Sequence, residues 1–350
     1  MEESIMKTWN KLLAGVLVLA ALTGCSAQTL PQEGAESPSG GSAAPAESAQ
    51  AYIDEAPILE IVEIEDEAVA LADAPTPAVS AALMPTASGT LTQSSDRAVI
   101  DYSNTKDGYV MVNCSGAGKK LMVRVYGPSY GANGTKYTYN LNPGEWTTFP
   151  LSDGSGAYKV VVHENTTGNK YSTLLTAEFT VTLTDEFAPF LRPNQYVNYQ
   201  NAVNSIAKAA QLTQRVADPL VKVEKIYQFV VNNVTYDQQK AATVQSGYLP
   251  VLDETLATGK GICFDYAALM AGMLRSQGVP CKLVVGYAGT VYHAWISVWT
   301  AETGWIDGAV YFDGASWHRM DPTFISSGGN SAAIQQYVGN GSNYNAMYLY

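Results

Sequence analysis

The sequence predicts an α+β fold in which a small all-β domain precedes a domain of helices packed on an antiparallel sheet. Three observations predict it. Short segments rich in β-branched and aromatic residues follow one another between residues 97 and 185. Segments with helical periodicity lie between residues 201 and 277, and from residue 282 the apolar pattern changes to the period of two that is typical of strands. A chain of 350 residues is long enough for both domains to have hydrophobic cores.

The first 25 residues have the pattern of an export signal. Two lysines precede an apolar run from Leu12 to Leu22, which is too short to span a bilayer as a mature helix. The run ends in Leu22-Thr23-Gly24-Cys25, which resembles the lipobox of bacterial lipoproteins, where the cysteine is lipidated and becomes the mature N-terminus. We therefore expect residues 1–25 to be a lipoprotein signal peptide and Cys25 to be the lipidation site. An ordinary secretory signal is the alternative, which changes the anchor but not the export.

Residues 26–95 have the composition of a disordered acidic linker, rich in Ala, Ser, Pro, Gly and Glu. Residues 12–96 contain twelve Asp and Glu and no Lys or Arg, so the net charge of −12 belongs to this segment. The remainder is balanced and has no basic patch, which argues against a nucleic-acid partner. The segment from Ile58 to Leu71 could form a transient helix or a docking strand, but disorder is the favoured interpretation.

Residues 96–185 are expected to form a small immunoglobulin-like sandwich, because short strands alternate with turn signals at close spacing. Trp146 and Phe149 are expected to fill its core. Cys114 and His163 are interpreted as structural, since neither has a plausible partner in the sequence. The domain could bind cell wall or carbohydrate, but a spacer is the favoured interpretation. The predicted strands are 110–112, 121–126, 137–141, 157–163 and 177–183.

Residues 186–350 begin with three predicted helices. The first lies within Asn201–Arg215, where apolar residues share one face. The second is amphipathic and begins after Asp218-Pro219, an N-cap residue followed by proline at the first helical position. The third begins at Cys263 and ends before Gly278, with a proline two residues later.

Cys263 lies in the first turn of the third predicted helix, directly after Gly259-Lys260-Gly261. The partial positive charge at a helix N-terminus favours thiolate over thiol, so the position suits a nucleophile. A small structural cysteine in the core would have the same local pattern. The thiol shares the apolar face of the helix with Ala267, Met270 and Leu274.

The segment after the third helix predicts an antiparallel meander that carries a histidine and an aspartate. His293 points away from the more aliphatic face of its strand, and Asp321 closes the last strand, because Pro322 must end the pairing. A cysteine nucleophile needs a base to take its proton and a third group to orient the imidazole. Cys263, His293 and Asp321 are therefore a candidate catalytic triad. The predicted strands are 282–287, 291–299, 304–312 and 316–321.

Four motifs resemble the bacterial transglutaminase-like superfamily over about residues 215–326: Gly261–Ala267, Gly278-Val279-Pro280, His293-Ala294-Trp295 and Asp321-Pro322-Thr323. The resemblance implies a papain-like core in residues 186–350 and assigns the Cys-His-Asp triad of the family to the same three residues. Members include cross-linking transglutaminases, peptidases and deglycosylating amidases, and members that have lost the triad serve as scaffolds.

The chain departs from the papain pattern because no glutamine lies shortly before Cys263. The side-chain donor of the oxyanion hole is therefore open. The backbone N–H of Cys263 is one expected donor, and Tyr236 is a candidate for the other or for a substrate contact.

Three alternatives compete at the candidate site. Cys281 could pair with Cys263, but a buried free thiol is favoured, because three cysteines remain if Cys25 is lipidated. Cys263 and His293 could bind zinc, but no paired ligand spacing supports a closed site, so neither a metal nor a cofactor is expected. His318 could replace His293 as the base. His293 is favoured, because His318 is only three residues from Asp321 on the same predicted strand.

These observations predict a cysteine acyl-transfer enzyme, lipid-anchored on the extracytoplasmic face of a bacterial membrane, that acts on amide bonds of peptides, proteins or cell wall. The thioester would pass to water, as in a peptidase or amidase, or to a primary amine, as in a transglutaminase; hydrolysis is favoured. The alternative is a catalytically inert lipoprotein that serves as a binding surface or scaffold. The sequence makes no prediction of the oligomeric state.

Overall fold

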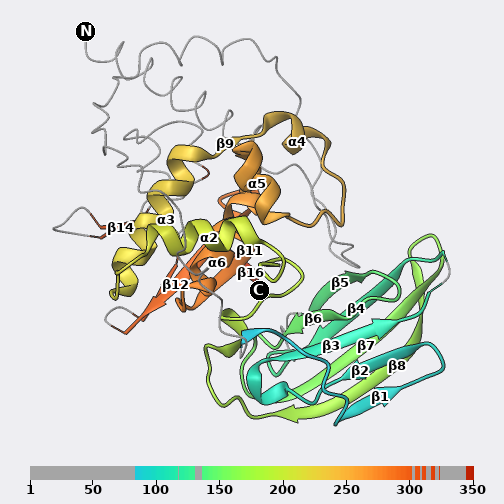
Figure 1. Cartoon of the computed structure of the whole chain (residues 1–350). Helices are drawn as coiled ribbons and strands as arrows, with labels where there is room; N and C mark the ends of the chain where they lie inside the picture. The colour runs from blue at the N-terminus through green and yellow to red at the C-terminus, as the bar shows by residue number, and fades with distance from the viewer. Residues whose placement is uncertain are drawn as a thin grey trace, which may run out of the picture. The chain divides into compact units, whose positions relative to one another are not determined.

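A computed structural model of the chain describes residues 83–116, 118–130, 136–301, 304–307, 310–312, 317–319, 323 and 344–350 (Figure 1). The predicted signal peptide, most of the predicted linker, Cys25 and Asp321 lie outside these residues. All described residues fall in one structural unit, and the domain boundary expected after residue 185 stays a prediction. Within the described part of the chain, no helix has the length and apolar character needed to cross a membrane.

The first described part consists of two four-stranded antiparallel sheets (Figure 1). The all-β prediction is therefore confirmed for this part of the chain, although the sequence pattern missed the short strands β1, β2 and β6. One sheet has the order β1 (Thr92–Ser94), β2 (Ala98–Asp101), β3 (Tyr109–Cys114) and β6 (Thr147–Pro150). The other has the order β5 (Lys136–Leu141), β4 (Leu121–Tyr126), β7 (Gly156–Thr167) and β8 (Lys170–Val181).

Alternate residues of both sheets meet in one hydrophobic core, as expected for strands with one buried face. Phe149 is completely buried, as predicted. The prediction that Trp146 fills the core is wrong, because 44% of its surface is exposed. Trp146 lies in the turn before β6 rather than in a strand, so the alternation of the sheet does not direct its side chain inward.

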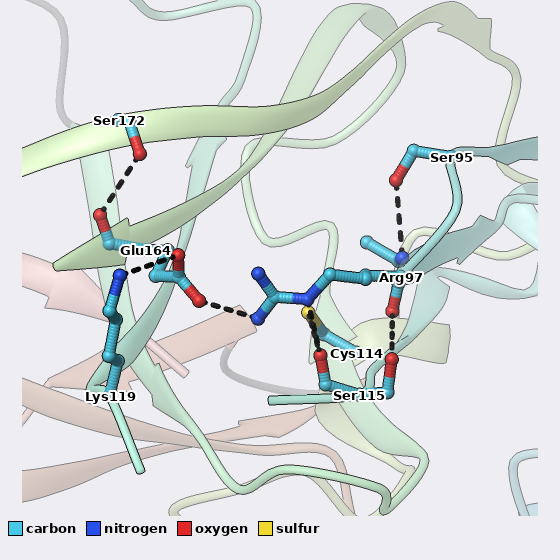
Figure 2. A network of polar contacts seen from close by, with 8 residues as sticks. Ser95, Arg97, Cys114, Ser115, Lys119, Glu164 and Ser172 are labelled. Atoms are coloured by element: carbon cyan, nitrogen blue, oxygen red, sulfur yellow. Dashed lines mark hydrogen bonds and ion pairs between the residues drawn. The ribbon is translucent and has the colours of Figure 1, made fainter. Parts of the chain in front are cut away.

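An ion-pair network joins the two sheets at one end (Figure 2). Arg97, directly before β2, donates to Glu164 of β7 at 2.5 Å, and Lys119 lies 3.5 Å from the other carboxylate oxygen. The hydrogen bond from Arg97 holds the pKa of Glu164 below its usual value. Cys114 lies beside this network as a buried free thiol whose pKa is raised by burial. These contacts fit the structural role predicted for Cys114, and ion pairs whose cations are open to solvent, as Arg97 and Lys119 are, add little stability.

The second described part places helices on a four-stranded antiparallel sheet, as predicted. The helices are α2 (Val203–Leu212), α3 (Pro219–Asn233), α4 (Gln238–Thr243), α5 (Leu252–Thr258) and α6 (Cys263–Ser276). The sheet has the order β13 (Gly304–Asp307), β12 (Val291–Thr300), β11 (Cys281–Ala288) and β16 (Tyr344–Leu349).

The predicted meander is correct in part: its last strand exists and pairs antiparallel with the segment before it, but this pair lies outside the main sheet. The segment 304–312 divides into β13 and β14 (Val310–Phe312), and β14 pairs with β15 (Trp317–Arg319) in a separate two-stranded sheet. The fourth position of the main sheet belongs instead to β16, which pairs with β11 at the opposite edge. This pairing joins segments about sixty residues apart, and the local pattern carries no signal for it.

Helix α6 is the centre of the second part. It packs on β11 and β12 and against α2, α3 and α5, and every residue from Cys263 to Arg275 is buried. A helix that is apolar on all sides is typical of such a position. Gly272 allows the close approach of α5, because a Cβ atom there would lie 2.3 Å from a methyl carbon of Leu252.

The far end of α6 is held by a buried guanidinium. Arg275 donates to the carbonyl oxygens of Cys281 at 2.8 Å, Arg192 at 2.8 Å and Tyr350 at 2.6 Å. Burial lowers the pKa of Arg275 to about 10, which still leaves the group charged at neutral pH. The three bonds tie α6 to β11 and to two segments distant in sequence, so the helix has little freedom to shift along its axis.

Candidate active site

The turn before α6 fixes the position of Cys263. Gly259 ends α5 in the left-handed conformation (φ +59°), where a side chain would be strained, and a Cβ atom there would lie 2.8 Å from the carbonyl oxygen of Asn233. The chain then pairs in parallel as β10 (Lys260–Gly261) with β9 (Thr235–Tyr236). Cys263 follows as the first residue of α6 and is 2% exposed. The predicted helix start is confirmed.

Asp265 supports this helix start, although sequence reasoning missed it. The N-cap residue is Ile262, whose side chain cannot accept a hydrogen bond. The carboxylate of Asp265 reaches back and accepts from the backbone N–H of Ile262 at 2.8 Å. The sequence did contain a signal for this capping role, because an acidic residue at the third position of a helix often caps the N-terminus from inside the helix.

His293 lies in β12, on the strand against which α6 packs, and is 3% exposed. Its imidazole is stacked on the indole of Trp295, with ring centroids 6.1 Å apart and planes at 21°. The ring of Tyr344, from β16, lies 6.4 Å from the imidazole and 5.1 Å from the indole, centroid to centroid. Cys263 and His293 thus come from two elements in direct contact, and aromatic rings border the imidazole.

Gly286 is the residue of β11 that pairs with His293. A Cβ atom at Gly286 would lie 2.0 Å from the carbonyl oxygen of Asn345 and 2.9 Å from the indole of Trp295. The missing side chain therefore lets Trp295 extend across β11 toward β16. Sequence reasoning missed this role, although an isolated glycine inside a strand pattern often marks a bulge or a close approach, and the β11–β16 register does shift between Val285 and Gly286.

Tyr236 lies beside the turn that leads to the cysteine. It pairs with Gly261 in the β9–β10 ladder and is half-buried. Hydrogen bonds on either side, from Thr235 N–H to Gly259 O at 2.8 Å and from Asp237 N–H to Gly261 O at 2.9 Å, fix the backbone of β9 against this turn. The location fits a contact near the nucleophile, and the role of Tyr236 as an oxyanion donor stays a prediction.

The other residues and alternatives that the sequence suggested for the site differ in how they compare with the structure. Asp321 lies outside the described residues. The backbone of His318 belongs to β15, which pairs with β14 and not with the sheet of His293. Cys281 is a buried free thiol, as favoured from the sequence, so a disulfide between it and Cys263 is excluded in this structure. In the described part of the chain, no group of three or more His, Cys, Asp or Glu side chains is placed to hold a metal ion.

Comparison with known proteins supports the fold. Residues 206–322 match the model of the Transglutaminase-like superfamily. A segment of 115 residues is 32% identical to a protein-glutamine gamma-glutamyltransferase of Pseudomonas aeruginosa, covering 29% of this chain and 17% of that protein. A segment of 117 residues is 26% identical to the protein YebA of Bacillus subtilis, covering 28% and 16%. The chain thus spans about a sixth of the length of these two curated relatives.

Two solved structures are also similar. A candidate cysteine protease from Cytophaga hutchinsonii has a TM-score of 0.32 and 18% identity, covering 61% of this chain and 78% of that one. Red sea bream transglutaminase has a TM-score of 0.26 and 15% identity, covering 61% and 48%. The family match, together with the helices on an antiparallel sheet, identifies residues 206–322 as a domain of the transglutaminase-like superfamily.

Proposed function

We propose that the protein is a cysteine acyl-transfer enzyme in which Cys263 attacks an amide carbonyl, His293 transfers the proton and Asp321 orients His293. One observation carries the proposal. Cys263 is the first residue of a buried helix, and that helix packs directly on the strand that carries the buried His293. A helix N-terminus favours the thiolate, which is the nucleophilic form of cysteine.

The reaction would proceed in two steps. The thiolate of Cys263 forms a bond to the amide carbon, and the C–N bond then breaks as His293 gives its proton to the leaving amine. This step leaves a thioester on Cys263. A second nucleophile then loses a proton to His293, attacks the thioester and releases the thiolate. The backbone N–H of Cys263 lies at the positive end of α6 and is the expected first donor to the developing oxyanion, with Tyr236 as the candidate for a second donor.

The acceptor in the second step decides the reaction. We favour water, which makes the protein a peptidase or amidase acting on a peptide, protein or wall-linked amide. Transfer to a primary amine is the second candidate, and it is favoured by the segment shared with the protein-glutamine gamma-glutamyltransferase of Pseudomonas aeruginosa. The triad would be the same in both reactions. The extent to which water is excluded from the thioester would therefore decide between hydrolysis and amine transfer.

We propose that a lipid on Cys25 anchors the protein to the extracytoplasmic face of the membrane.

The competing function is a binding or scaffold protein without catalysis. It is the weaker candidate, because both the cysteine and the histidine of the family motif are present on contacting elements.

The test is incubation of the reduced full-length chain with a glutamine-containing peptide and a labelled primary amine, analysed by mass spectrometry. A peptide–amine adduct identifies amine transfer, and cleavage or deamidation of the peptide identifies hydrolysis. Cys263→Ala is the matched control and should abolish either product. Products that persist in Cys263→Ala, or an absence of products across a panel of peptide and wall-derived amides, would contradict the proposal.

A further inference from the structure

A buried carboxylate in the first turn of α6 has partners from two other segments. Asp265 is completely buried. Besides the N–H of Ile262, it accepts a hydrogen bond from the phenol of Tyr248 at 2.5 Å, and the ammonium group of Lys240 lies 3.0 Å from its Oδ2 atom. Lys240 belongs to α4, and Tyr248 lies in the loop between α4 and α5. We call Asp265, Lys240 and Tyr248 the Asp265 cluster.

The members of the Asp265 cluster also support one another. The ammonium group of Lys240 lies 4.5 Å from the centre of the Tyr248 ring, a favourable cation–π arrangement. Burial, together with the hydrogen bond to Asp265, raises the pKa of Tyr248, which keeps its phenol protonated and able to donate. The ring of Tyr248 also meets Phe264 edge-on, with centroids 6.5 Å apart.

Gly261 provides an independent sign that the turn is built around this carboxylate. A Cβ atom at Gly261 would lie 2.6 Å from the Cβ atom of Asp265. The N–H of Asp237, the N-cap residue of α4, donates to the carbonyl oxygen of Gly261 at 2.9 Å. The α4 segment therefore contacts the start of α6 twice, once through the backbone of Asp237 at Gly261 and once through Lys240 at Asp265.

The charges in this turn have a consequence for Cys263, two residues from Asp265. An unbalanced carboxylate so close to the thiol would oppose the thiolate, whereas the positive end of the helix favours it. Lys240 balances that carboxylate. An ion pair with a fully buried carboxylate is a weak source of stability compared with apolar packing, so stability alone is a poor explanation for this one.

We propose that the Asp265 cluster is a positioning device for the nucleophile: it fixes the Gly261-Ile262 turn that leads into Cys263 and keeps the charge beside the thiol balanced. The role as a positioning device rests on the proposed function, but the electrostatic effect on Cys263 can be measured without a substrate. None of the three residues acts on the substrate itself in this proposal.

Other titratable groups lie on the elements around this turn. Asp237 lies at the start of α4, Glu254 lies in α5, Tyr236 ends β9 and His293 lies in β12. These groups stay in place when Lys240 or Asp265 is changed, so differences between variants isolate the cluster from the rest of the site.

The test is the rate of alkylation of Cys263 by iodoacetamide as a function of pH. It uses the reduced full-length chain, with the modified peptide quantified by mass spectrometry. Lys240→Met should raise the midpoint by about half to one pH unit, because a carboxylate is left unbalanced near the thiol. Asp265→Asn should lower the midpoint by a similar amount, because an ammonium group is left unbalanced. The double variant should return to within about 0.3 units of the unmodified chain.

Two controls complete the design. Lys240→Arg keeps the charge and should leave the midpoint nearly unchanged. Lys170→Met removes an exposed charge from β8 and should have no effect. Circular dichroism confirms the fold of each variant. If Asp265→Asn does not fold, the difference in alkylation midpoint between Lys240→Met and Lys240→Arg is sufficient to test the proposal.

The proposal is overturned if folded Lys240→Met and Asp265→Asn both leave the midpoint unchanged or shift it in the same direction, since a purely structural role would do so. Failure of the proposed function would give a different experimental result. In that case the unmodified chain itself has an ordinary midpoint near about 8.5 and no amide substrate reacts, whatever the variants do.

Discussion

Trp295 and His293 are stacked on one face of β12, with ring centroids 6.1 Å apart. The contact depends on Gly286 in the neighbouring strand, because only a residue without a side chain leaves room for the indole to reach Tyr344. The conformation of the candidate base is thus coupled to the packing of three strands.

Gly286→Ala tests this coupling. The added methyl group would meet the backbone of β16, which cannot move without breaking its pairing with β11. We expect the free energy of unfolding to fall by about 2–3 kcal/mol, as for other overpacked cores. Urea denaturation measures it. Gly89→Ala is a suitable control, because Gly89 has φ +71° and no neighbouring atom within 4 Å, so it adds backbone strain of only about 1 kcal/mol. Equal losses in both variants would contradict the coupling.

Cys281 predicts a pH dependence of stability. Burial raises its pKa to about 12, from an ordinary value of about 9.0. The folded state therefore keeps the proton where the unfolded state loses it. Its stabilising contribution is complete below pH 9 and declines as the pH rises toward 12, by up to about 1.4 kcal/mol per pH unit.

The measurement is the free energy of unfolding between pH 8 and 11 for the unmodified chain and for Cys281→Ala. Because the tyrosines that burial protects from ionisation make the same contribution in both proteins, the difference between the two curves reports Cys281. We expect the alanine variant to lose less stability above pH 9. Parallel curves across this range would show that the thiol is accessible to solvent or ionised in the folded state.

Cys25→Ala tests the proposed lipid anchor. Without a lipidation site, the protein should be released from membranes or remain unprocessed. Membrane fractionation of cells that produce each form measures it, with Cys114→Ala as a control that leaves the export signal intact. An unchanged membrane fraction for Cys25→Ala would require a different anchor.

Asp321→Asn tests the third member of the proposed triad. An amide can stabilise the wrong imidazole tautomer and cannot balance the charge of an imidazolium, so turnover should fall. In serine triads the comparable change costs about 10⁴ in rate, and we expect about 10² to 10³ here, because a thiolate–imidazolium pair forms before attack. Turnover is measured on a substrate from the amine and peptide screen, after circular dichroism shows that the variant folds. Full activity in the folded variant would remove Asp321 from the triad.

The sequence predicted the elements with long, regular patterns and missed those that depend on distant partners. The starts of α3 and α6 and the strands β11 and β12 are where periodicity placed them. Helices α4 and α5, of 6 and 7 residues, are too short for a periodic signal. The pairing of β16 with β11 joins distant segments, which local patterns do not encode.

The candidate site divides in the same way. Cys263 and His293 were predicted because each stands at a recognisable point of a helix or a strand. The Asp265 cluster was missed because Tyr248 and Lys240 lie 17 and 25 residues before Asp265, and only the fold brings α4 to the start of α6. Gly286 was missed because the neighbours that it accommodates belong to two other strands.

The most direct test of the central claim is whether His293 controls the reactivity of Cys263. The pH dependence of alkylation of Cys263 is compared in the reduced unmodified chain, His293→Ala and His318→Ala. A thiolate–imidazolium pair predicts a midpoint well below about 7 in the unmodified chain, a rise toward about 8.5 in His293→Ala and no change in His318→Ala. A midpoint near 8.5 in the unmodified chain that does not move in His293→Ala would contradict the account, and a shift confined to His318→Ala would assign the base to His318.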